Sequence, residues 1–272
     1  MAGYKFDYET KVWGGEKLRV SPIHFRASRL FFALKELKNK KGIKLLDVGC
    51  GVGDFVEAFS YYLPKLNLTA TDISQKAIES AKKRGIKAKF IVADAEKLPF
   101  KSNFFNIVTC FDVLEHVKSP SVMLKEINRV LKPGGILHAF IPTEDNIFSP
   151  EGLLIKLGWR AKEIYGGHPH HYNYLFISKL LDKSGFKIKK TRWGEHFTNQ
   201  IIEILYFTFL SLKGKNLDYS VEGYLESVEK SPLISIFRFI KNIFATISYI
   251  EARLFYWFPG GLGVHITSVK KI

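Results

Sequence analysis

Residues 45–55 read LLDVGCGVGDF, a short apolar run followed by a glycine-rich loop. Glycine has no Cβ, so Gly49, Gly51 and Gly53 let the backbone turn sharply and approach a ligand closely. A plain tight turn between a strand and a helix would also fit, and dinucleotide-binding domains use a related loop. The stretch therefore predicts a strand, a ligand-binding turn and the start of a helix.

Short apolar runs alternate with amphipathic stretches along most of the chain, which is typical of βαβ units and a parallel sheet. The predicted strands are 43–48, 67–72, 87–92, 104–111, 135–141, 186–193 and 263–270. The predicted helices are 22–38, 53–62, 74–84, 119–131 and 173–184, with Pro133-Gly134-Gly135 turning one helix into the next strand. We divide the chain into a leading helix or lid (1–42), a core (43–198), a helical insertion (199–258) and a last core strand (259–272).

Two acidic residues follow predicted strands at positions that suit a nucleotide cofactor. Asp72 ends the second strand about 20 residues after the glycine loop, where a carboxylate can accept both ribose hydroxyls. Asp94 follows the third strand, where its carboxylate would lie near an adenine amino group. A NAD-binding unit has no comparable need for Asp94, although an ordinary surface-loop role remains its alternative.

These segments resemble the class I S-adenosylmethionine-dependent methyltransferases, and within them the ubiquinone/menaquinone-biosynthesis-like, small-molecule subgroup. The resemblance also rests on the stretches FDVLEHV at 111–117 and LKPGGIL at 131–137, and it covers about residues 43–142. It implies a Rossmann-like α/β fold: a doubly wound, seven-stranded sheet, parallel except for its seventh strand, with a helical insertion before that strand.

The resemblance also implies S-adenosyl-L-methionine as the cofactor and assigns residues to it. They are Asp47 and Gly49 at the methionine end, Gly51 and Gly53 in the loop, Asp72 with Ile73 at the ribose, Asp94 with Ala95 at the adenine, and the Phe111 carbonyl at the adenine amino group. Candidates for closing over the cofactor, on position alone, are Tyr4, Tyr8, Trp13 and Arg26.

Methyl transfer from a sulfonium needs no acid for the leaving group, so positioning can supply much of the acceleration and a protein base is optional. If the acceptor is a hydroxyl, His116 is the best placed base, with Glu115 orienting it. A loop-orienting role for His116 fits equally. His171, Tyr172 and Tyr174 are the predicted acceptor-pocket residues. A metal held by the histidines at 168, 170 and 171 is not favoured, because no Cys or carboxylate stands at a ligand spacing.

The acceptor is predicted to be small and hydrophobic or lipid-linked, methylated at oxygen or carbon. The FDVL stretch at 111–114 replaces the Asn/Asp-Pro-Pro-Tyr/Phe stretch of amino-methylating nucleic-acid enzymes, which argues against a nucleic-acid partner. Two alternatives stay open. One is an RNA methyltransferase, and the other is a non-catalytic S-adenosylmethionine-binding or membrane-scaffold protein.

The formal net charge is +15, from 41 Lys+Arg and 26 Asp+Glu, which favours contact with a phospholipid surface, a nucleic acid or a phosphorylated substrate. A solvated basic surface explains the charge as well. The two cysteines lie in apolar segments and form no spaced cluster, so we expect a reducing, cytoplasmic environment. No uncharged apolar run reaches the roughly 18–20 residues of a membrane span, and peripheral attachment at the inner face of a membrane stays open.

Residues 232–258 predict an unusual amphipathic helix. One narrow stripe is polar or small, namely Arg238, Lys241, Ala245, Ser248 and Ala252. The remaining face is broad and apolar, and Phe255, Tyr256 and Trp257 follow it. Water alone would not cover so many large side chains, so we expect protein, a greasy substrate, a second copy in a homodimer or lipid against this face.

Overall fold

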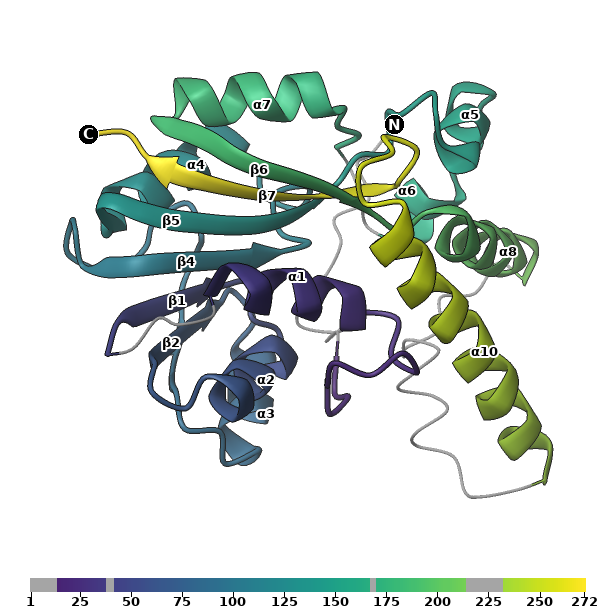
Figure 1. Cartoon of the computed structure of the whole chain (residues 1–272), viewed down its shortest axis with the longest axis horizontal. Coiled ribbons are helices and arrows are strands. Elements are labelled where there is room, and N and C mark those ends of the chain that lie inside the picture. Colours follow the sequence, from purple (N-terminus) through teal and green to yellow (C-terminus); the bar gives the residue numbers. More distant parts are fainter. Residues whose placement is uncertain (1–13, 38–41, 167–169, 214–231) are drawn as a thin grey trace.

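The computed structural model describes residues 14–37, 42–166, 170–213 and 232–272. Within them, the strands form one sheet in the order β3-β2-β1-β4-β5-β7-β6 (Figure 1). Strands β1 to β5 pair in parallel, whereas β7 runs antiparallel to both β5 and β6. The bounds are β1 Lys44–Val48, β2 Asn67–Asp72, β3 Lys89–Val92, β4 Phe105–Phe111, β5 Leu131–Pro142, β6 Phe186–Gly194 and β7 Gly263–Lys270.

Helices pack on both faces of this sheet (Figure 1). One face carries α1 (Ala27–Leu37), α2 (Asp54–Tyr62) and α3 (Gln75–Lys83), and the other carries α4 (Pro120–Val130) and α7 (Tyr174–Lys183). The predicted fold class, a doubly wound seven-stranded sheet that is parallel except for its seventh strand, is confirmed. The strand order reverses between β1 and β4, and ligands of such sheets bind in the crevice at the carboxyl ends beside that reversal.

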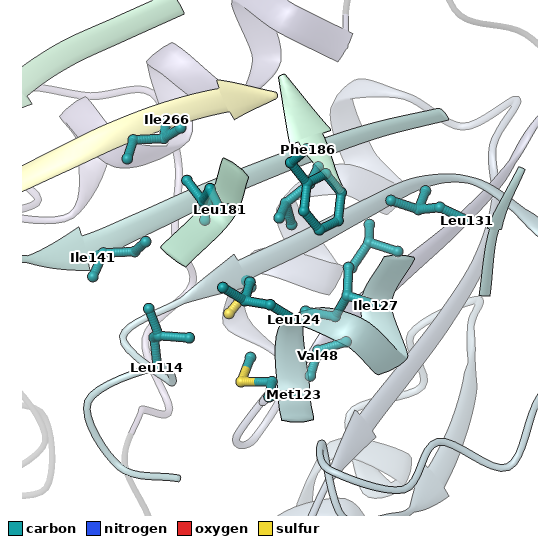
Figure 2. Close-up of a cluster of buried hydrophobic side chains, with 14 of the residues drawn as sticks. Val48, Leu114, Met123, Leu124, Ile127, Leu131, Ile141, Leu181, Phe186 and Ile266 are labelled. Atoms are coloured by element: carbon teal, nitrogen blue, oxygen red, sulfur yellow. The ribbon is translucent and has the colours of Figure 1, made fainter. Parts of the chain in front are cut away.

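The core between the sheet and helices α4 and α7 includes apolar residues that recur at helical spacing along α4. Met123, Leu124 and Ile127 lie on one side of α4 and are at most 2% exposed. Figure 2 shows them gathered with Leu181 of α7 and Phe186 of β6. Full burial of each such side chain contributes roughly 1.5–3 kcal/mol, so this layer fixes both helices on the sheet.

The start of β5 differs from the prediction. The strand begins at Leu131 rather than 135, because Leu131 already pairs with Phe105 of β4. The register then shifts before Ile136, and Gly134 adopts a left-handed φ of 70° in the irregular stretch. The Pro-Gly-Gly sequence therefore forms a bulge inside a strand, and α4 ends at Val130.

Further helices lie beyond the carboxyl ends of the parallel strands (Figure 1). They are α5 (Pro150–Lys156), α6 (Ala161–Gly166), α8 (Phe197–Lys213) and α10 (Pro232–Leu254). Helices α5 and α6 had no counterpart in the sequence prediction, and α10 ends four residues before the predicted limit at 258. No helix in the described part of the chain is long and apolar enough to cross a membrane.

Two histidines are buried side by side beneath α1. His138 of β5 and His265 of β7 are almost fully buried, and their ring centroids lie 5.6 Å apart. His138 Nδ1 lies 2.9 Å from Thr267 Oγ1. Burial lowers the pKa of His138 to about 4 and the pKa of His265 well below its ordinary value. Both rings are therefore neutral in the folded protein near neutral pH.

The histidine pair predicts a loss of stability in mild acid. The folded-state pKa values lie below the ordinary value of 6.5, so the stabilisation is complete above that pH and is lost as the pH falls toward 4. At pH 5 His138 weakens folding by roughly 2 kcal/mol, and His265 acts in the same direction. Urea unfolding at pH 7.5 and pH 5 should show that His265→Phe loses less stability between the two pH values than the wild type. Equal losses would contradict this account.

Candidate functional site

The glycine loop adopts the conformation that its sequence requires. Gly49, Gly51 and Gly53 have φ values of 71°, 53° and 87°, in the left-handed region that favours glycine. A Cβ on Gly49 would lie 2.2 Å from Val113 Cγ2, so a side chain there is excluded. The amides of Gly49 and Cys50 donate to the Thr71 carbonyl at 2.8 and 2.9 Å. These bonds tie the loop after β1 to the end of β2.

Asp72 joins the same two loops through its side chain. One carboxylate oxygen accepts the Gly51 N–H at 2.7 Å, and the other accepts the Ser74 N–H at 3.0 Å. Ile73 is exposed beside it. The carboxylate is thus held rigidly at the carboxyl end of β2, where the sequence placed a ribose-binding acid.

Asp47 is the most unusual acid in the described residues of this site. It is 2% exposed at the carboxyl end of β1, and its carboxylate accepts a hydrogen bond from Thr109 Oγ1 at 2.6 Å. Burial raises the pKa of Asp47 to about 7, and the nearby Asp72 carboxylate adds to the shift, while the Thr109 hydrogen bond opposes it. A cationic group placed beside Asp47 would restore its charge.

The predicted adenine region is arranged by local turns. The Asp94 carboxylate accepts the Glu96 N–H at 2.8 Å, as in an Asx turn, and Ala95 packs against the core. The Phe111 ring stacks on Phe55 of α2 with centroids 4.0 Å apart. Contact of these residues with a cofactor stays a prediction.

The leading segment lies over the glycine loop. The buried Asp54 carboxylate accepts the Gly15 N–H at 3.2 Å and pairs with Arg26 at 2.5 Å and with Arg84. Arg26, a candidate for closing over the cofactor, therefore anchors the segment to the first turn of α2. The other candidates, Tyr4, Tyr8 and Trp13, lie outside the described residues.

A partly buried ion-pair network that the sequence did not reveal joins α1 to the segments that follow β4 and β6. Arg29 of α1 pairs with Asp112, which follows β4, and with Glu195, which follows β6. Its guanidinium also lies 4.0 Å from the ring centroid of Phe140 in β5. Asp112 and Glu195 both have a left-handed φ, of 52° and 56°. Asp112 belongs to the FDVLEHV stretch at 111–117, but only the tertiary structure brings it close to Arg29.

The predicted base and the predicted pocket residues occupy neighbouring loops. His116 Nε2 lies 3.8 Å from Glu115 Oε1. The Tyr172 hydroxyl donates to the Leu114 carbonyl at 3.2 Å, so the segment before α7 lies against the loop after β4. Burial raises the pKa of Tyr172, which keeps its hydroxyl a donor. The Tyr174 hydroxyl lies 3.1 Å from Thr191 Oγ1, away from this contact.

A second charged cluster lies after β5. His171 Nδ1 is 3.0 Å from Oε2 of the buried Glu144. Glu144 Oε1 is 3.0 Å from Lys162 Nζ, which also pairs with Glu151 and Glu203. Burial alone would lower the pKa of Lys162, but these carboxylates outweigh it and raise the pKa well above its ordinary value. Sequence spacing had singled out His171 but gave no sign of its partner Glu144.

A metal centre does not form in the ranges that the structure describes, where no group of three or more His, Cys, Asp or Glu side chains is suitably placed. His168, one of the three histidines considered, lies outside those ranges.

The comparison with protein families concerns the part of the chain that contains the predicted cofactor residues. Residues 46–139 match the family described as a methyltransferase domain. The chain contains a class I S-adenosylmethionine-dependent methyltransferase domain. S-adenosylmethionine is the methyl donor in this family. The matched residues run from β1 into β5 and so include every predicted cofactor residue.

Known proteins resemble this chain in sequence and in fold. Demethylmenaquinone methyltransferase of Staphylococcus aureus (strain JH9) is 40% identical over 108 residues, which are 38% of this chain and 45% of that protein. The chain thus matches less than half the length of its curated relatives.

Solved structures share the fold. Phosphoethanolamine N-methyltransferase 2 of Haemonchus contortus, in complex with S-adenosyl-L-methionine, gives a TM-score of 0.56 at 20% identity, covering 90% of this chain and 52% of that one. The [4+2]-cyclase SpnF gives 0.57 at 20% identity, covering 90% and 82%. One fold therefore supports different reactions, and the site residues must carry the functional argument.

Removal of the Arg29 side chain should strongly destabilise the protein, and neutralising its two carboxylate partners should restore part of the stability. Arg29→Met should lower the free energy of unfolding by about 3–5 kcal/mol, because it leaves the buried Glu195 carboxylate and the partly exposed Asp112 carboxylate without their cation. Adding Asp112→Asn and Glu195→Gln should recover part of the loss, and Asn tolerates the left-handed φ at 112. Urea unfolding measures all three. A single variant within 1 kcal/mol of wild type, or a triple variant less stable than the single one, would contradict the network.

Proposed function

We propose that this chain transfers a methyl group from S-adenosylmethionine to the oxygen or carbon of a small, hydrophobic or lipid-linked acceptor. The observation that carries the proposal is the buried Asp47 carboxylate beside the glycine loop. Among the residues that the structure describes, this carboxylate accepts a hydrogen bond from the Thr109 hydroxyl and faces the Asp72 carboxylate, so its ionised form lacks a compensating positive charge there. The methionine part of the cofactor carries an ammonium group, which would supply it.

The residues present fit the cofactor along its length. Asp47 and Gly49 would hold the methionine end, Asp72 with Ile73 the ribose, Asp94 with Ala95 the adenine, and the Phe111 carbonyl the adenine amino group. The cofactor supplies an electrophilic methyl group on a sulfonium that departs as a neutral thioether. The chain's own task is to position the acceptor in line with that methyl group and, for a hydroxyl acceptor, to take its proton.

Two features support a hydrophobic acceptor. The curated relative described above is named for demethylmenaquinone, although it matches only 38% of this chain. The helices beyond the carboxyl ends of the strands, α5, α8 and α10, carry many exposed apolar side chains on the acceptor side of the sheet. An apolar acceptor could approach the site over such a surface without leaving an apolar environment.

Asp47→Asn should abolish micromolar binding of S-adenosylmethionine, because the amide keeps the Thr109 hydrogen bond but offers no charge to the ammonium group. Calorimetric titration of the wild type, Asp47→Asn and Asp72→Asn measures this. A surface variant such as Asp182→Asn is the control and should bind like the wild type. Unchanged binding by Asp47→Asn would remove the main support for the proposal.

The same variant should be more stable than the wild type without cofactor. The pKa of Asp47 is raised in the folded state, so its stabilising contribution is present at low pH and lost as the pH rises through about 7. Ionisation then weakens folding by roughly 4 kcal/mol above pH 7. Thermal unfolding should show a larger gain for Asp47→Asn at pH 8 than at pH 5.

Two histidines compete for the role of general base. His116 was the candidate from sequence, and its Nε2 lies 3.8 Å from Oε1 of Glu115. His171 Nδ1 lies 3.0 Å from the buried Glu144, and its Nε2 lies 3.7 Å from Glu163 Oε2. A carboxylate therefore faces each ring nitrogen of His171, and neither nitrogen is left clear to accept a proton. We therefore keep His116, with Glu115 orienting it, as the base for a hydroxyl acceptor and assign His171 to the acceptor pocket.

Turnover can be followed as release of S-adenosylhomocysteine in the presence of a lipid extract as the acceptor pool. His116→Ala should lower kcat by about 100-fold or more, since general bases contribute 10²–10⁴-fold. Glu115→Gln should lower kcat less. His171→Ala is the matched comparison and should keep kcat. The reverse pattern would give the base role to His171.

The same assay separates the alternatives. Tight cofactor binding with no S-adenosylhomocysteine from any acceptor pool would indicate a non-catalytic binding protein. Turnover on RNA, with affinity that falls steeply as salt rises, would indicate an RNA methyltransferase.

A further inference from the structure

Helix α10 presents its large apolar side chains to solvent. Phe239, Ile243 and Leu254 are 66%, 44% and 60% exposed, and further exposed members recur at helical spacing between them. Those further members are Ile240, Phe244, Ile247 and Ile250. The neighbouring helix α8 exposes Ile201, Leu205, Phe209 and Leu212 at the same kind of spacing. We call these residues of α8 and α10 the apolar platform.

The narrow stripe of α10 is the side that packs against the protein. Ala245, Ser248 and Ala252 are at most 3% exposed, and the helix contacts α1 and α8. Tyr249 packs edge-on to Phe31 of α1, with ring centroids 6.4 Å apart. Small side chains let α10 approach its neighbours closely, so its broad apolar face is left on the outside. Apolar patches of this extent on a single chain mark interaction surfaces.

The charges around the platform select its occupant. The acidic residues of α8 and α10 are Glu203 and Glu251, and both point toward the protein: Glu203 pairs with Lys162, and Glu251 accepts hydrogen bonds from Thr198. Arg238 and Lys241 are half-buried members of the narrow stripe of α10, and the exposed Arg253 lies over the Phe31 ring of α1, 4.7 Å from its centroid. The chain as a whole carries a net charge of +15. Such a charge repels a second copy and attracts an anionic surface.

The chain directly after α10 adds aromatic residues of the interfacial type. Phe255, Tyr256 and Trp257 are exposed, with Trp257 at 67%. Tryptophan and tyrosine favour the boundary between lipid headgroups and acyl chains. Apolar helix faces, inward acids, basic residues and exposed aromatics form the pattern of a helix pair lying in the plane of a membrane interface.

We infer that the apolar platform docks on an anionic phospholipid bilayer. Helices α8 and α10 lie beyond the carboxyl ends of the parallel strands (Figure 1), and the glycine loop and Asp72 lie at those ends of β1 and β2. Docking turns that side toward the lipid, so that an acceptor dissolved in the bilayer has a short path to the site. The inference rests on the proposed function only for the identity of the acceptor, since binding to lipid is a property of the surface itself.

The test is flotation of the full chain with vesicles of phosphatidylcholine alone and of phosphatidylcholine with phosphatidylglycerol. The wild type should float with the anionic vesicles and much less with the neutral ones. The platform variant Ile247→Ser with Leu254→Ser should bind about tenfold more weakly. Its matched control is Val122→Ser with Leu175→Ser on α4 and α7, where exposures of 41% and 62% resemble the 42% and 60% of the platform pair. The control should bind like the wild type.

Three further measurements make the outcome decisive. Thermal unfolding and calorimetric binding of S-adenosylmethionine should be equal in the platform variant and the wild type, which separates lipid binding from folding and from the proposed function. A wild type that does not float, or a platform variant that floats equally well, would overturn the inference even if cofactor binding is intact. Sedimentation would also overturn it by showing a dimer that the platform variant loses, with no binding to vesicles, because a second copy would then cover the platform.

Discussion

The parallel pairing of β1 between β2 and β4 is the constraint on which the rest of the site depends. Val48 lies opposite both Thr71 and Cys110, so the three strands end at almost the same level. The chain must turn three times within one crevice, and each turn delivers an acid: Asp47 beside the first, Asp72 at the second and Asp112 after the third. The glycines of the first turn make room for these neighbours and for a ligand.

Sequence reasoning reached the features that are local in the chain. The glycine loop, Asp72 and the succession of strands and helices follow from short-range patterns, because backbone conformation and hydrophobic periodicity depend on neighbouring residues. The arrangement of the strands in the sheet was predicted only through the family resemblance. The Arg29 network and the Glu144–His171 pair could not be reached in this way, since each joins segments far apart in sequence. Helices α5 and α6 are short, and their apolar residues are too few to show a period.

Helix α10 illustrates a different limit. Its periodicity correctly located two stripes, a narrow one and a broad apolar one, but hydrophobicity alone does not say which stripe packs. Close approach to α1 and α8 is possible only where side chains are small, and Ala245, Ser248 and Ala252 supply that surface. Residues in a protein core are mostly apolar, but apolar residues need not lie in the core. In α10 the small side chains determine which face packs against the protein, and the large apolar side chains stay exposed.

The place of β7 in the sheet has a consequence for how the protein is made. This strand lies between β5 and β6, yet it follows both of them in the chain, after α8 and α10. On the ribosome, β5 therefore emerges with an open edge, and β6 has no partner until residues 263–270 have been synthesised. The strands up to β5 can assemble in the meantime, so the half that holds the cofactor residues is able to fold before the half that closes the sheet. During that interval the unpaired edge of β5 is the part of the nascent chain most exposed to wrong pairing.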